Sequence, residues 1–112
     1  MARDDAYLVD ILDAARLALA YVSGKDKEEF DHDIQCQDAV IRRIEVIGEA
    51  ARRISEQTQA KYPQLPWSAM ISMRNVMIHD YNTIDLTIVW DTVLRDLPPL
   101  IAELEKIAPL EE

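Results

Sequence analysis

Apolar residues recur along the chain at intervals of three and four, the spacing that places them on one face of an α-helix. Four segments show this pattern, at about residues 4–23, 33–61, 66–80 and 86–107. The alternation typical of half-buried strands is absent from the sequence. We therefore predict an all-α fold, an antiparallel bundle of four to five helices.

The first segment has an apolar stripe and ends near a glycine. Gly24 suits the left-handed position that follows many helices. Ser23 and Asp26 have the spacing of a capping box, which predicts a short helical turn through Phe30. The stripe of the first segment consists of Leu8, Ile11, Leu12, Ala15, Leu19 and Val22.

The second segment is the longest and should end before Pro63, because proline disfavours helix at the residue before it. Residues 31–33 read as a capping region at its start. Gly48 and Ala51 are small and lie on or near its stripe, so we expect a neighbouring helix to approach closely there. The stripe consists of Ile34, Ile41, Ile44, Ile47, Ala51 and Ile54.

The third segment should begin near Pro66, since proline is tolerated in the first turn of a helix, and should reach His79 or Asp80. A loop over residues 81–84 then leads to Asp85, a good N-cap. In the last segment the apolar period persists across its two adjacent prolines. We therefore expect one kinked helix over 86–107 rather than two.

Arg74 does not fit a simple apolar face. It falls in the middle of the apolar stripe of the third segment, and further apolar residues flank that stripe. We therefore expect this helix to be central and well buried. A guanidinium group in such a place is costly unless it forms an ion pair or has a functional role. A buried carboxylate such as Glu45 or Glu49 is the simplest partner. The stripe around Arg74 consists of Trp67, Met70, Ile71, Met77 and Ile78.

A second polar stripe on the same segment includes Asn75 and His79, which are four residues apart and can meet. Arg74 and His79 are five apart, about 140° around an ideal helix. The helix could unwind near His79, or two chains could bring this helix together across a two-fold axis. A simpler interpretation is that His79 complements the helix dipole and that Tyr81 is a packing aromatic.

Length and charge limit the function. A chain of 112 residues suits one domain, residues 1–112. The net charge of −9 disfavours general binding to nucleic acid. Residues 40–75 nevertheless hold six basic and three acidic side chains, so this window is +3 and the rest is −12. The window is either a set of ordinary solvated ion pairs or a local basic surface for a polyanion or an acidic partner.

Cellular location and metal binding follow from a few residues. Cys36 is the single cysteine, which excludes an internal disulfide. The charged start at 1–5 does not resemble a signal peptide, and no apolar run approaches the roughly 18 residues of a membrane span. These features favour the cytoplasm. His32 and Cys36 are too few to build a zinc site, so we expect structural roles for both and no cofactor.

The octapeptide at 74–81, RNVMIHDY, resembles the R-N-x-x-x-H-x-Y signature of the HEPN superfamily. More specifically, it is similar to that of the HepT toxins of two-gene toxin–antitoxin modules. Residues 41–50 resemble the long second major helix of that family. Residues 65–67 resemble its entry to the motif helix, and 84–90 resemble the helix that follows. The likeness covers nearly the whole chain.

This resemblance implies a homodimer with a composite active site between protomers and metal-independent endoribonuclease activity. Arg74 and His79 would be the catalytic pair, with Asn75 in a supporting role. The resemblance also implies a cognate antitoxin of the minimal nucleotidyltransferase type, which transfers AMP from ATP to the motif tyrosine, Tyr81. A bulky anion two residues from His79 would obstruct a phosphate site.

Two other functions remain open at this stage. The acidic balance would suit a non-catalytic binding subunit that docks a nucleotidyltransferase and uses Tyr81 only as a modification acceptor. A purely structural helical dimer would have no use for Arg74, and an apolar residue there would then be tolerated or even stabilising.

Overall fold

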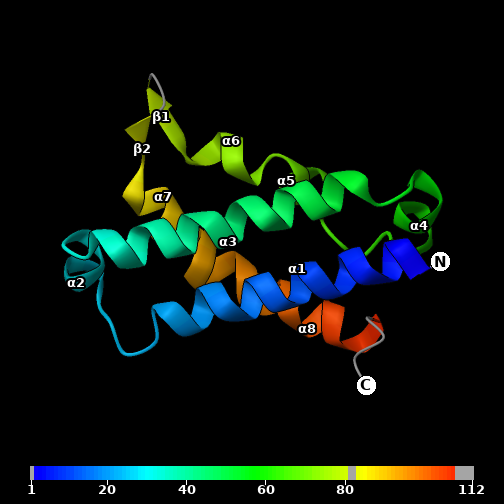
Figure 1. Cartoon of the computed structure of the whole chain (residues 1–112), viewed down its shortest axis with the longest axis horizontal. Coiled ribbons are helices and arrows are strands. Elements are labelled where there is room, and N and C mark those ends of the chain that lie inside the picture. Colours follow the sequence, from blue (N-terminus) through cyan, green and yellow to red (C-terminus); the bar gives the residue numbers. More distant parts are fainter. Residues whose placement is uncertain (1, 81–82, 108–112) are drawn as a thin grey trace.

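The computed structural model describes residues 2–80 and 83–107 (Figure 1). The helical elements are α1 (Ala2–Tyr21), α2 (Lys27–Asp31), α3 (Ile34–Arg53), α4 (Glu56–Lys61), α5 (Trp67–Ile71), α6 (Met73–Met77), α7 (Leu86–Asp91), the π-helical turn η1 (Thr92–Asp96) and α8 (Leu97–Ile107). A short hairpin of β1 (Ile78–Asp80) and β2 (Thr83–Ile84) lies between α6 and α7. The prediction of a predominantly helical bundle is confirmed.

The bundle is built on α1 and α3, which run antiparallel and form the most extensive pairing (Figure 1). On one side α8 packs against α1, and on the other α5 and α6 run along α3. Most of the expected stripes face the resulting core. Ile34 does not, because it is the first residue of α3 at the end of the bundle, and it is 70% exposed. The largest buried side chains include Leu8, Ile11, Leu12, Ile44, Ile47, Leu97 and Leu104.

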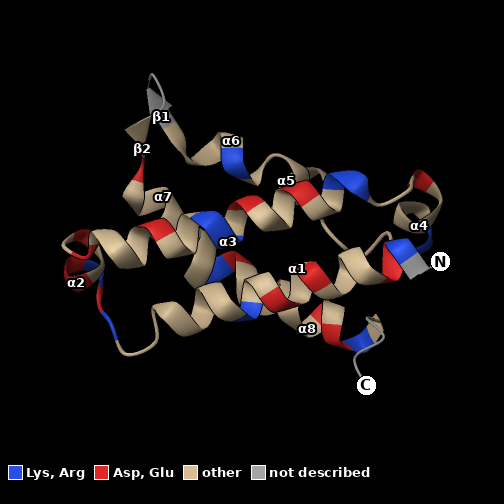
Figure 2. Cartoon of the chain, in the orientation of Figure 1, with Lys and Arg blue, Asp and Glu red and all other residues tan. Residues whose placement is uncertain are grey.

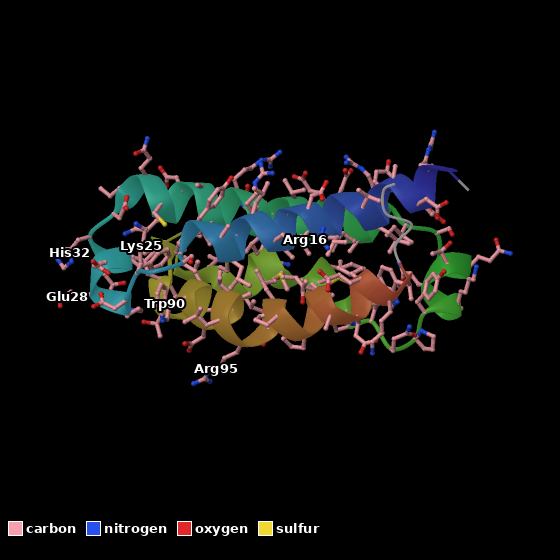
Figure 3. The ribbon with its side chains drawn as sticks, turned by 90° about the horizontal axis from the view of Figure 1, so that it is seen from below. Arg16, Lys25, Glu28, His32, Trp90 and Arg95 are labelled. Carbon is pink, nitrogen blue, oxygen red and sulfur yellow. The ribbon has the colours of Figure 1, made fainter. Side chains whose placement is uncertain are left out.

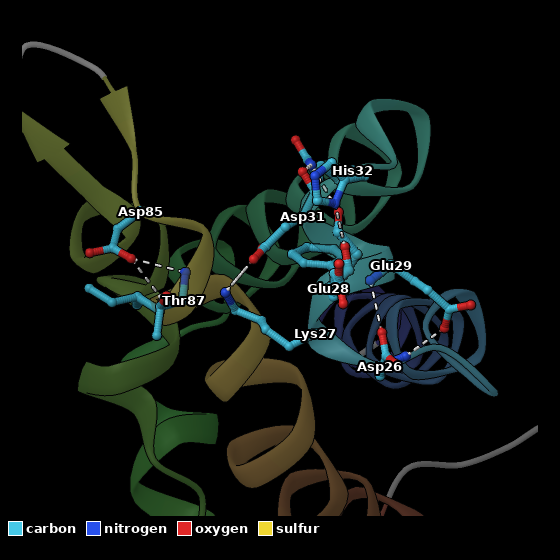
Figure 4. Close-up of polar contacts among 11 residues, drawn as sticks. Asp26, Lys27, Glu28, Glu29, Asp31, His32, Asp85 and Thr87 are labelled. Atoms are coloured by element: carbon cyan, nitrogen blue, oxygen red, sulfur yellow. Dashed lines mark hydrogen bonds and ion pairs between the residues drawn. The ribbon is translucent and has the colours of Figure 1, made fainter.

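The turn after α1 confirms one expectation and corrects another. Gly24 has a φ of 80°, as a helix-terminating glycine requires. The capping box, however, consists of Asp26 and Glu29 rather than Ser23 and Asp26 (Figure 4). The Glu29 amide donates to Asp26 Oδ1 over 2.8 Å, and the Asp26 amide donates to Glu29 Oε1 over 2.9 Å. The Ser23 amide still bonds to Ala20 at the end of α1, so Ser23 cannot start the next helix.

The expected helix at 33–61 is two helices. Asp33 is the N-cap, as expected, and accepts from the Cys36 amide. At Ile54 the backbone becomes extended and buries the side chain, and Ser55 then caps α4. Asp4 of α1 accepts hydrogen bonds from Ser55 Oγ over 2.7 Å and Thr58 Oγ1 over 2.6 Å. These contacts stabilise the break, and periodicity alone does not reveal them.

The expected helix at 66–80 is also shorter and divided. Ser72, with φ −93° and ψ 4°, separates α5 from α6. The helix ends at Met77, and the chain then enters the hairpin, where Ile78 pairs with Ile84 and Asp80 pairs with Thr83. The prediction of helix to residue 79 or 80 and of an unpaired loop was therefore wrong. So few residues pair that no alternating pattern could signal them.

The last segment follows one helical path across its two prolines, as expected. Its departure from a regular α-helix is η1, where the Leu97 amide donates to the Thr92 carbonyl five residues earlier. Pro98 and Pro99 lack the N–H groups that a regular helix would use. The π-helical turn lies directly before these two prolines. Helices tolerate such an insertion when it is a single turn.

The end of the bundle near α2 is closed by aromatic packing and local hydrogen bonds. The ring centroids of Phe30 and Trp90 are 5.2 Å apart, and Trp90 lies at the same end as His32 (Figure 3). His32 Nδ1 donates to the Glu28 carbonyl over 2.8 Å. Cys36 is buried, which raises the pKa of its thiol. Within residues 2–80 and 83–107, no helix has the length and apolar character needed to cross a bilayer.

Candidate functional site

Helices α5 and α6 lie at the edge of the bundle, and Arg74, the first residue of the octapeptide motif, faces outward. Met70, Met73 and Met77 are buried and anchor α5 and α6 to the core. Arg74 follows Met73 by one residue, a rotation of about 100° that carries it to the exposed side. Val76 is 52% exposed as well. The expectations that Arg74 sits on the buried face and that this helix is central were therefore wrong. Three methionines, rather than the wider apolar set, form its buried stripe.

Gly48 allows α5 to lie close to α3. A Cβ atom at position 48 would be 3.2 Å from the Met70 carbonyl oxygen and 3.5 Å from the Ile71 carbonyl oxygen. Both atoms belong to the backbone, so a larger residue would displace the helix itself. The close approach expected at Gly48 is confirmed. It determines how near the motif segment, which consists of α5, α6 and the hairpin, lies to the exposed face of α3.

An ion pair joins α6 to α3. Arg74 Nε donates to Glu45 Oε2 over 3.2 Å, with the Arg74 side chain 56% and the Glu45 side chain 27% exposed. Arg42 Nη1 lies 3.5 Å from Glu45 Oε1 and 3.6 Å from Glu49 Oε2. The expected carboxylate partner of Arg74 is confirmed as Glu45, although the pair is near the surface. Ordinary ion pairs therefore account for Arg42 and Arg74 in the basic window.

These charges surround a polar hollow of about 180 Å³ between α3 and the motif segment. Figure 2 shows acidic and basic segments alternating along this side of α3, with a basic position on α6 beside them. Guanidinium groups and a carboxamide are suited to bind phosphate oxygens. The lining residues are Glu45, Gly48, Glu49, Arg52, Ile71, Arg74 and Asn75.

Arg52 and Glu45 were not singled out as site residues from the sequence. Glu45, Glu49 and Arg52 are spaced by four and three residues, which places them on one face of α3. That spacing was the available signal. Glu45 and Glu49 were considered as carboxylate partners of Arg74, but periodicity did not show which helix would cover this face, so Arg52 was counted only within the basic window.

The backbone after Arg74 and Asn75 leaves the helix before it reaches His79. The Met77 carbonyl accepts from the Asp85 amide over 2.7 Å, which closes the base of the hairpin. Asp85 Oδ1 in turn caps α7 by accepting from the amides of Thr87 over 3.0 Å and Ile88 over 3.2 Å (Figure 4). The helix thus ends two residues before His79. This agrees with the expectation that the helix could unwind near that residue.

Two predicted site groups fall outside what the structure describes. The backbone of His79 lies in β1, but its side chain is outside the described residues, and so is the whole of Tyr81. The structure therefore places Arg74 and Asn75 on one hollow and fixes the backbone path to His79.

A larger hollow of about 380 Å³ lies on another side of α5, toward η1 and α8. Its lining is mostly apolar, and its charged groups are the carboxylates of Asp96 and Glu103. These would repel a phosphate group. The smaller polar hollow beside Arg74 is therefore the better candidate for an anionic ligand.

Comparison with known proteins points to one family. A family model described as "Ribonuclease HepT-like" matches residues 11–107. The chain is 38% identical to "Putative RNase MJ1380" of Methanocaldococcus jannaschii, covering 89% of this chain and 92% of that protein. It is 38% identical to "Probable ribonuclease HepT" of Thermococcus cleftensis, covering 90% and 92%. It is 30% identical to "Putative RNase TTE0752" of Caldanaerobacter subterraneus, covering 95% of each. No solved structure matches the chain significantly.

Proposed function

The chain belongs to the HepT-like ribonuclease family, and we propose that it is a metal-independent endoribonuclease that uses Arg74, Asn75 and His79. The observation that carries this proposal is the position of Arg74 and Asn75 on one solvent-reachable polar hollow. A guanidinium held at the surface by a single carboxylate can still bind an anion, which a buried and fully paired one could not.

The proposed reaction is transfer of the phosphoryl group to the ribose 2′-hydroxyl. The 2′-oxygen attacks phosphorus, its proton passes to a base, and the bond from phosphorus to the 5′-oxygen breaks. An acid protonates the departing 5′-oxygen, leaving a 2′,3′-cyclic phosphate and a 5′-hydroxyl. Histidine is the side chain whose ordinary pKa lies near neutral pH, and for this reason we assign a proton transfer to His79. Arg74 would stabilise the charge that develops on the phosphate oxygens, with Asn75 as a hydrogen-bond donor.

We propose that the active unit is a homodimer. The acid and the base act on opposite sides of the reacting phosphate, and each chain brings one motif histidine. A two-fold axis beside the hairpin would supply both. Sedimentation of the purified protein tests the dimer. The role of two histidines is tested by subunit exchange with His79→Ala chains. Cleavage should fall as the square of the wild-type fraction, and a linear fall would overturn the shared site.

The nuclease activity itself is tested with single-stranded RNA in EDTA. Wild-type protein should cleave it, and His79→Ala should abolish cleavage while the thermal unfolding transition is retained. His32→Ala is the matched control, because His32 bonds to the Glu28 carbonyl and is not part of the lining of the polar hollow, so this variant should leave cleavage unchanged. Equal cleavage by wild type and His79→Ala would exclude the catalytic role.

We further propose that a nucleotidyltransferase antitoxin neutralises the protein within a two-gene module. The Tyr81 oxygen would attack the α-phosphorus of ATP and release pyrophosphate, so that the tyrosine carries AMP. The motif places this residue two positions after His79, where the added phosphate would compete with RNA phosphate. Incubation with the partner and ATP should add the mass of AMP, Tyr81→Phe should remove that addition, and cleavage should stop in parallel. An unchanged mass would exclude the modification.

The net charge of −9 favours one alternative, a non-catalytic subunit that binds the nucleotidyltransferase and only accepts AMP. Under this alternative the purified chain would leave RNA intact in every condition and would still be modified at Tyr81. The cleavage assay and the mass measurement together separate the two functions.

A further inference from the structure

We infer that Arg52 is a second phosphate-binding residue, which holds the RNA backbone beside the phosphodiester engaged by Arg74. The inference rests on the proposed nuclease function and adds a substrate contact that the motif does not contain. Three observations support it. They are the position of Arg52, the lack of an ion pair to Arg52 among the described side chains, and the charges of the residues around the hollow.

Arg52 lines the same hollow as Arg74 and Asn75. It lies on α3 seven residues after Glu45, the residue that holds Arg74. Seven residues are two helical turns, so Arg52 is about 10.5 Å along the axis of α3 from Glu45. The hollow therefore has an arginine at each end, and a nucleic-acid strand lying along α3 would meet both.

The charge of Arg52 is left available. In the part of the chain with described side chains, 3–78 and 83–107, Arg52 forms no ion pair, even with Glu49 three residues before it. Glu49 is directed instead to Arg42. Arg74, by contrast, already donates its Nε to Glu45. Arg52 thus retains its whole planar fork of donors for a ligand, which is the geometry that phosphate oxygens accept.

The balance around the hollow is positive although the whole chain is acidic. Arg42, Arg52 and Arg74 lie on or beside the hollow, against the two carboxylates Glu45 and Glu49. Within the lining the two arginines balance the two carboxylates, and Arg42, which pairs with both carboxylates from outside the lining, brings this group of side chains to +1. A polyanion would be attracted here and repelled elsewhere, which restricts binding to the strand that crosses this hollow.

Arg53 provides a matched control. It is adjacent to Arg52, is also exposed and shares the last turn of α3, so each arginine complements the helix dipole. Arg53 does not belong to the lining of the hollow. Arg52→Gln and Arg53→Gln therefore remove the same charge from the same helix end and differ in access to the hollow.

The experiment measures binding of a fluorescein-labelled, 2′-O-methylated single-stranded RNA by anisotropy, in EDTA and at several salt concentrations. Arg52→Gln should weaken binding about tenfold and lower the slope of log affinity against log salt by about 0.7. Arg53→Gln should change neither. In cleavage assays on unmodified RNA, Arg52→Gln should raise KM and leave kcat near that of wild type. Thermal unfolding of both variants should match wild type.

The outcomes separate this inference from the nuclease itself. Equal binding by the two variants, or no binding of the oligonucleotide by wild type, would overturn the role of Arg52 whether or not RNA is cleaved. Selective weakening by Arg52→Gln, with unmodified RNA left intact, would support Arg52 as an RNA contact and exclude the proposed catalysis.

Discussion

Arg74 on α6 reaches across to α3, where its Nε donates to Oε2 of Glu45 over 3.2 Å. This contact uses one edge of the guanidinium group and orients the edge formed by the two terminal nitrogens. Arg42 holds the other oxygen of the same carboxylate at 3.5 Å. Glu45 thus holds Arg74 in place, and replacing Glu45 should affect RNA cleavage more than folding.

Glu45→Gln should lower kcat for RNA cleavage by about tenfold, because Arg74 loses a charge-assisted hydrogen bond that orients it. The free energy of unfolding should fall by less than about 1 kcal/mol, since the pair is partly exposed. Glu49→Gln is the control. It loses a contact with Arg42 but none with Arg74, so its kcat should match wild type, and the loss of a carboxylate from the hollow should lower KM. Equal kcat values for the two variants would show that Glu45 does not position Arg74.

Gly48→Ala should destabilise the protein by about 1 kcal/mol, measured by urea unfolding. The added methyl group would be 3.2 Å from a backbone oxygen of Met70, and the cost of overpacking should exceed the gain in helix propensity. Cleavage should also fall, because displacement of α5 moves α6.

Gly24→Ala is the comparison for that experiment. Its φ of 80° makes alanine unfavourable by about 1 kcal/mol, but the turn after α1 lies on the other side of α3 from α6 (Figure 1). It should lose stability and keep its activity per folded molecule. Unchanged or increased stability in Gly48→Ala would mean that α5 yields without cost.

Asp4→Asn should reveal a pH-dependent contribution to stability. Hydrogen bonds from Thr58 and Ser55 lower the pKa of Asp4 from its usual value of 3.8. The stabilising effect is therefore complete above pH 3.8. It declines below that value as the unfolded chain takes up the proton first, and it is lost as the pH falls through the lower pKa of the folded state.

Urea unfolding at several pH values measures this effect. The difference in free energy of unfolding between wild type and Asp4→Asn should be constant near neutral pH and should shrink below pH 3.8. Asp5→Asn, which changes an exposed neighbour on α1, should give a difference that does not shrink in this way. A difference for Asp4→Asn that stays constant down to acid pH would contradict the contacts between α1 and α4.

Asp85→Ala should lower stability by about 1 kcal/mol, because the amides of Thr87 and Ile88 lose their acceptor at the start of α7. Cleavage should fall too, because loosening the start of α7 shifts the backbone amide of Asp85, which closes the base of the hairpin that carries His79. Asp85→Asn keeps an acceptor oxygen and should preserve most of both properties. Thermal unfolding and initial rates measure them. Cleavage by Asp85→Ala at the wild-type rate would show that the cap of α7 does not influence the site.

Much of the helical bundle was predictable, because apolar periodicity follows directly from burial on one face. The stripe of α1, the close approach at Gly48 and the continuous path across Pro98 and Pro99 are local consequences of residue type. The breaks were not predictable in this way. The break near Ile54 depends on Asp4, which is 51 residues from Ser55 in the chain, and periodicity contains no information on such contacts.

Of the predicted site residues, Arg74 and Asn75 lie together on one hollow, in a setting that the sequence did not predict. The octapeptide motif identified Arg74, Asn75 and His79, and the carboxylate partner of Arg74 was among the alternatives. The expected burial was wrong because Met70, Met73 and Met77 form the fully buried side of α5 and α6, which leaves Arg74 on the exposed side. Arg52 was missed because nothing in its own helix shows which segment lies across from it.

The motif segment lies at the edge of the bundle, away from the central pairing of α1 with α3. It consists of α5, α6 and the hairpin, and it meets the rest of the chain mainly at α3 and α7. Amide protons in this segment should therefore exchange with deuterium through local opening, long before those in the centres of α1 and α3 exchange. Such opening would widen the access for a nucleic-acid strand beside Arg74 while the packing of α1 against α3 is kept.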